Sequence, residues 1–92
     1  MSAPTYECGG YTRLTATGNV APTPKALLGF FVASTNAGTI QFYDSPTTTT
    51  STPITGVITP AAGAFYPIKA YGSTGVYAVI AGTALDVTII TA

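Results

Sequence analysis

The sequence predicts an all-β protein: a small antiparallel β-sandwich, jelly-roll-like or immunoglobulin-like, with about seven strands. Of its 92 residues, 47% are hydrophobic and only 7% are charged. Threonine takes over much of the solvating role of lysine and glutamate, and as a β-branched residue it favours strands. Apolar runs with a two-residue period recur every eight to twelve residues or so between turn-forming residues, which is the spacing of short paired strands.

The length of the chain predicts a single domain. We expect residues 11–92 to form the sandwich. Residues 1–10 contain Pro4, Gly9 and Gly10 and show no periodicity, so this segment is expected to be an extended N-terminal arm that reaches a neighbouring molecule.

The stretch Leu27–Asp44 predicts a β-hairpin around which the other strands are arranged. Asn36 and Gly38 tolerate positive φ, which favours a short turn within residues 34–38. The first strand of this hairpin is apolar on both faces, with Leu28, Phe30 and Val32 on one side and Leu27, Phe31 and Ala33 on the other. Such a strand is either covered twice within the fold or covered on one side by another molecule.

The remaining predicted strands are Tyr11–Thr17, Ile54–Thr59, Phe65–Tyr71, Val76–Ala81 and Leu85–Thr91. The last two are expected to form a second hairpin around residues 82–84, and Gly18–Pro24 is expected to be a turn and an extended connection. Pro67 lacks a backbone donor, which favours a sheet edge or a bulge. The predicted core contains Leu28, Phe30, Val32, Ile40, Phe42, Val87 and Ile89, and Phe65 is also assigned to it.

The sequence contains few side chains that could perform catalysis, and we expect that the chain is not an enzyme and binds no cofactor. The chain has no histidine, which excludes Ser-His-Asp and Cys-His catalysis and histidine metal sites. Of the three acids, only Asp44 and Asp86 could conceivably meet, and a solvated or turn-capping role is expected for them. Cys8 is single and cannot form an internal disulfide.

The charges are few and balanced. They are Glu7, Arg13, Lys25, Asp44, Lys69 and Asp86, and they sum to zero. No basic groove for nucleic acid is predicted, and no apolar run approaches the ~20 residues of a membrane span. The polar start of the chain predicts a soluble protein made in the cytoplasm. With so little charge repulsion between copies, we expect a homo-oligomer.

Exposed aromatic side chains are the candidate binding groups, because tyrosine buries a large area at low entropic cost and keeps a hydroxyl for hydrogen bonding. An alternative use of the same side chains is a carbohydrate-stacking platform. The predicted oligomer or partner interface comprises Tyr6, Tyr11, Leu27, Phe31, Tyr43, Tyr66, Tyr71 and Tyr77.

From Gly38 to Thr91 the chain resembles small all-β virion proteins of tailed bacteriophages, of the capsid decoration (cement) type. The resemblance is carried by Gly38–Asp44, Thr59–Gly63, Phe65–Pro67, Ser73–Gly75, Val79–Thr83 and Asp86–Ile89. It implies a subunit, favoured as a trimer, that binds the major capsid protein on the outer capsid surface and stabilises the head. A tail or head-fibre component, or a receptor- or glycan-binding β module, remains the alternative, as does a free lectin-like domain.

Overall fold

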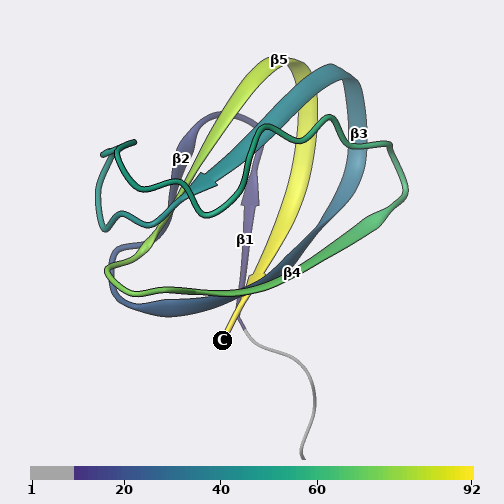
Figure 1. Ribbon diagram of the computed structural model, residues 1–92. Coiled ribbons are helices and arrows are strands. Elements are labelled where there is room, and N and C mark those ends of the chain that lie inside the picture. The colour runs from purple at the N-terminus through teal and green to yellow at the C-terminus, as the bar shows by residue number, and fades with distance from the viewer. Residues whose placement is uncertain (1–9) are drawn as a thin grey trace, which may run out of the picture.

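The computed structural model describes residues 10–92, apart from the side chains of residues 36, 37, 83 and 84. Its strands, shown in Figure 1, are β1 (Gly10–Leu14), β2 (Gly18–Ala21), β3 (Lys25–Tyr43), β4 (Phe65–Gly72) and β5 (Val76–Thr91). The described part of the chain contains no helix, and all strand pairs are antiparallel. The predicted all-β class is therefore confirmed. Of the predicted arm, residues 1–9 lie outside the described residues, and Gly10 begins β1.

β3 and β5 pair with each other along almost their whole lengths, from Leu27 opposite Thr91 to Tyr43 opposite Tyr77. The register shifts repeatedly between Val32 and Thr39. Bulges of this kind add twist and bend a sheet. Figure 1 shows the two strands arching together over the top of the molecule. The bend folds the continuous sheet into two layers.

The first layer contains β1, the C-terminal half of β5, the N-terminal half of β3, and β4, in that order. The second layer contains β2 and the other halves of β5 and β3. The segment between β3 and β4 borders this second layer through bridges from Ile58 to Ile40 and from Pro53 to Tyr43. The predicted small β-sandwich is thereby confirmed.

The core lies between the two layers and consists of Ala21, Leu27, Phe30, Val32, Ile40, Phe42, Val76, Ala78, Leu85, Val87 and Ile89. Phe30 from the first layer meets Phe42 from the second, with ring centroids 5.4 Å apart. Each large apolar side chain buried in this way contributes about 1.5–3 kcal/mol. Of the residues that the sequence predicts in the core, all are buried except two. Leu28 is half-buried, and Phe65 is exposed.

Leu27 and Leu28 have exchanged their predicted environments. Leu27 is fully buried, whereas Leu28 is half-buried. The cause is a β-bulge: Leu27 pairs with Thr91 and Gly29 with Ile90, so β3 carries one extra residue at this point. An extra residue reverses the facing of the strand beyond it. The strict alternation assumed from the sequence was therefore wrong at the start of β3.

Both predicted hairpins were wrong, because each strand continues through the expected turn and bends there without reversing direction. Residues 34–38 belong to β3, and residues 82–84 belong to β5. Gly38 does not adopt positive φ; instead a Cβ placed there would lie 3.0 Å from the Cβ of Leu85. Gly82 does adopt positive φ, at 89°, but within a bent strand. These glycines serve the bend of the paired strands rather than chain reversal.

Two shorter segments also differ from prediction. Gly18–Ala21 is β2 and not a turn, because it pairs with β5. Ile54–Thr59 is not a continuous strand and reaches β3 through the bridge at Ile58. Gly56 interrupts this segment and Pro60 follows it, and both residues limit regular pairing there.

Candidate interaction surface

The outer side of the first layer carries exposed apolar side chains on β1, β3 and β4, and a half-buried one, Ile90, on β5. We call this surface the aromatic face, and it consists of Tyr11, Phe31, Phe65, Pro67, Tyr71 and Ile90. Tyr11 is 75% exposed, Tyr71 65%, Phe65 51% and Phe31 41%. Cross-strand partners share one face of a sheet, and here Tyr11 pairs with Ile90 and Phe31 with Phe65. The aromatic face thus spans the layer from edge to edge.

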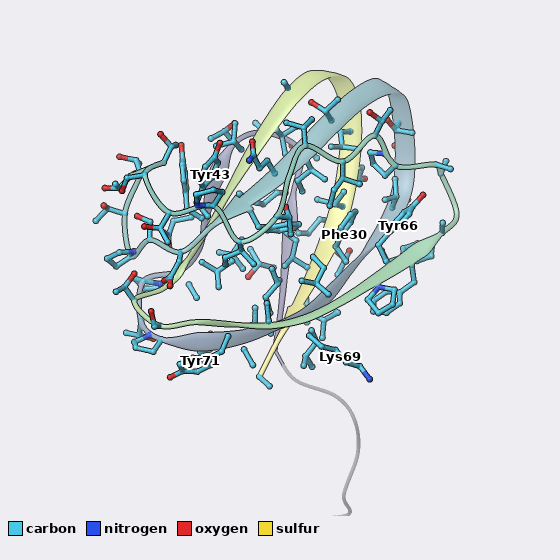
Figure 2. The ribbon with its side chains drawn as sticks, viewed as in Figure 1. Phe30, Tyr43, Tyr66, Lys69 and Tyr71 are labelled. Carbon is cyan, nitrogen blue, oxygen red and sulfur yellow. The ribbon has the colours of Figure 1, made fainter. Side chains whose placement is uncertain are left out.

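β4 supplies half of this surface because its side chains alternate strictly between exposed and half-buried positions. Figure 2 shows Tyr71 and Lys69 pointing away from the body of the molecule, whereas Tyr66 points inward with Phe30. The inward pair is stacked, with ring centroids 5.1 Å apart. A Cβ at Gly29 would collide with the backbone carbonyl oxygen of Tyr66 and lie 2.8 Å from Cζ of Phe65, so the glycine allows the β4 backbone and this ring to lie close.

The polar margin of the aromatic face is an ion pair between β1 and β5. Arg13 donates from Nε to Oδ1 of Asp86 at 2.9 Å and from Nη2 to Oδ2 at 2.6 Å. This fork geometry matches a guanidinium to a carboxylate. The hydrogen bond from Arg13 lowers the pKa of Asp86, and the same contact raises the pKa of Arg13. The pair is exposed and contributes little to folding.

The structure brings only part of the predicted interface together. Tyr11, Phe31 and Tyr71 lie on the aromatic face. The sequence predicts Phe65 in the core, whereas the structure exposes it on the aromatic face. Its sequence context held the signal, since Phe65 shares its two-residue register with Pro67 and Lys69, which are both poor core residues. Leu27 was predicted to face outward and instead lies in the core.

The other predicted tyrosines lie elsewhere. Tyr66 is half-buried between the layers, and its hydroxyl accepts a hydrogen bond from the Ala61 N–H at 2.8 Å. Tyr43 and Tyr77 form a pair on the second layer with ring centroids 6.3 Å apart. Tyr77 is only 8% exposed. Tyr6 lies outside the described residues.

Asp44 closes one end of the sandwich. Its Oδ2 accepts hydrogen bonds from the N–H and Oγ of Ser73 at 3.1 and 2.7 Å, and its Oδ1 accepts from the N–H and Oγ1 of Thr74, both at 2.8 Å. These donors, with the Ser73 hydroxyl first, hold the pKa of Asp44 far below its usual range. Asp44 therefore caps the turn between β4 and β5, as the sequence predicted.

The two acids that might have formed a catalytic pair are engaged separately. Both oxygens of Asp44 bind the Ser73–Thr74 turn, and both oxygens of Asp86 bind Arg13. Within residues 10–92 there is no cluster of three or more histidine, cysteine or acidic side chains that could hold a metal ion. No helix long and apolar enough to cross a membrane occurs in the same residues.

Comparison of the chain with known protein families, with curated proteins and with solved structures finds no match. What the geometry defines is a small all-β sandwich whose most distinctive exposed feature is the aromatic face.

Proposed function

We propose that this chain is a structural subunit of a bacteriophage virion that binds the major capsid protein on the outer surface of the head and stabilises it. The observation that carries the proposal is the aromatic face: four exposed aromatic rings on the outer side of one layer of the sandwich. Contiguous exposed apolar surface of this kind is typical of protein interaction sites. The resemblance of residues 38–91 to capsid decoration proteins supplies the partner.

The chemistry of the described residues supports a binding role over a catalytic one. Asp44 and Asp86 are used to hold a turn and an ion pair, and the chain has no histidine. A subunit that contacts two or more capsid proteins adds association free energy to the shell, because it binds the assembled state and not the dispersed one. Several copies acting together multiply this gain through avidity.

The test compares phage particles that contain the chain with particles made by a phage whose gene for the chain has been deleted. We expect the particles that lack the chain to rupture at a lower temperature and after a milder osmotic shock. Purified protein added back should restore the threshold. Equal thresholds for the two kinds of particle would contradict the stabilising role.

A pair of variants tests whether the aromatic face is the attachment surface. The double variant Phe65→Ser, Tyr71→Ser should no longer bind to particles that lack the chain, while its circular dichroism spectrum stays that of the parent protein. The matched control is Val57→Ser, which removes an apolar side chain that is 66% exposed but lies on the segment between β3 and β4. Equal binding by both proteins would place the attachment surface elsewhere.

A glycan- or receptor-binding module in a tail or fibre is the second candidate. The observation that favours it is the position of the Arg13–Asp86 pair beside exposed rings, since sugars bind to aromatic rings and to charged hydrogen-bonding groups together. Two results together would favour this candidate over a role on the capsid. The chain would be found in purified tails and not in heads, and Tyr11→Ser would lose binding to a glycan array.

A further inference from the structure

We infer that β1 pairs, through its free edge, with β1 of a second copy of this chain, in antiparallel register around a two-fold axis at Thr12. β1 pairs with β5 alone among the described strands, so no strand of residues 10–92 lies along its opposite edge. An unpaired edge presents a row of backbone N–H and C=O groups, and another extended strand is the partner that satisfies them together.

The two edges of the first layer are not equivalent. β4 is protected against pairing: Pro67 has no N–H, the register shifts beside it, and Lys69 adopts φ 56° with an exposed side chain. Proline, bulges and lysine are the devices by which proteins block sheet edges. β1 has none of them. It pairs with β5 residue by residue from Gly10 to Leu14 without a shift.

The charge on β1 does not guard its edge either. Arg13 is held by Asp86 on the neighbouring strand, so its guanidinium is drawn over the sheet. In register around Thr12, Tyr11 faces the partner's Arg13 and the reverse contact repeats by symmetry. Directly opposed Cβ atoms in an antiparallel pair lie about 4.5–5.5 Å apart, which lets a tyrosine ring pack on the aliphatic stem of the opposed arginine.

A second copy fits this edge better than an unrelated strand for two reasons. The chain has zero net charge, so copies do not repel one another. Antiparallel neighbours in one sheet share its faces, so the pairing would join two aromatic faces into one continuous surface. The inference stands on the edge geometry and not on the proposed function. It predicts a two-fold pair in place of the trimer implied by the resemblance.

The first experiment measures the mass of the whole chain by light scattering at micromolar concentration. We expect twice the 9.3 kDa of one chain. Tyr11→Lys places like charges opposite each other at two symmetric positions and should weaken the dimer about tenfold or more. Tyr71→Lys is the matched control, because Tyr71 is similarly exposed on the same face but lies on β4, and its dimer should be unchanged.

The second experiment is a cross-link in a Cys8→Ser background. Thr12→Cys lies on the two-fold axis, within the Cα separation of a disulfide, and should form a covalent dimer on mild oxidation. Tyr71→Cys should not. A monomer or trimer mass for the parent chain would overturn the inference. So would a dimer that resists Tyr11→Lys and does not cross-link at Thr12→Cys, or one that cross-links at Tyr71→Cys instead.

Discussion

The outer sides of the two layers present very different surfaces, although β3 and β5 run through both layers. On the first layer Tyr11, Phe31, Phe65 and Tyr71 are exposed. On the second, Tyr77 is buried against Tyr43, whose hydroxyl donates to Gln41 Oε1 at 2.8 Å. Gln41 Nε2 in turn donates to the Thr55 carbonyl at 2.9 Å. The segment between β3 and β4 folds against the second layer and leaves the first bare.

The end of the second layer is also held by contacts to backbone carbonyl groups. The side-chain Nδ2 of Asn19 on β2 donates to the carbonyl oxygens of Ser45 and Thr47, at 3.4 and 3.0 Å. Gly75 lies so close to this segment that a Cβ there would be 2.6 Å from the carbonyl oxygens of both Ala21 and Ser45. The difference between the layers shows that aromatic content alone does not make a binding surface, because coverage by the rest of the chain decides which rings are free.

The largest expected effect comes from comparing two phenylalanines. Phe42→Ala, in the core, should lower the free energy of unfolding by about 3–5 kcal/mol, nearly the whole stability of a small domain. Phe65→Ala, on the aromatic face, should cost about 1 kcal/mol or less. Thr49→Ala in the exposed segment after β3 should change stability by about 0.5 kcal/mol at most. Urea unfolding of the three variants and the parent measures these changes in the free energy of unfolding. Equal changes for Phe42→Ala and Phe65→Ala would contradict the assignment of one ring to the core and the other to the surface.

A second comparison uses two glycines. Gly75→Ala should lower the free energy of unfolding by about 1–3 kcal/mol, because its methyl group meets backbone oxygens that cannot easily move. Gly56→Ala is the control, since a Cβ there meets nothing within 4 Å and its φ is not positive. If thermal melts show the same loss of stability for both variants, the backbone around Gly75 is less tightly packed than described.

The third effect is a pH dependence located at Asp44. Its pKa is lower in the folded state than in the unfolded chain, so the stabilisation is complete above about pH 4 and is lost as the pH falls below that value. Asp44→Asn should be less stable than the parent at pH 6, and the gap should narrow toward pH 2. Urea unfolding at several pH values measures the gap. A constant gap across this range would show that the carboxylate charge plays no part.

The smallest effect is expected at the margin of the aromatic face. Arg13→Lys loses the two-pronged contact with Asp86, and because the pair is exposed the melting temperature should stay within error of the parent. The pKa of Asp86, followed by carboxyl NMR, should rise toward its ordinary value. A fall in melting temperature comparable with that of Phe42→Ala would mean that the ion pair is needed for folding.

Much of the candidate surface could be predicted from residue type and period. Tyr11, Phe31 and Tyr71 were placed outward because each falls opposite to core residues in a two-residue pattern, and the structure exposes all three. Phe65 was missed because a phenylalanine near aliphatic residues suggests a core. Leu27 was misplaced because one bulge shifts the pattern, and the sequence around Gly29 does not reveal whether the glycine forms a turn, a bulge or a close contact.

The sequence by itself determined the all-β class and most of the core, because composition and a two-residue period depend only on local residue choice. Only the tertiary structure decided that β3 and β5 are continuous. Each strand passes its expected turn because its partner, roughly fifty residues away in the chain, bends with it and stays paired with it in the bend, Ser34 with Asp86 and Asn36 with Thr83. Such pairing is a non-local property, so glycines that favoured two hairpins in the sequence became part of one folded sheet.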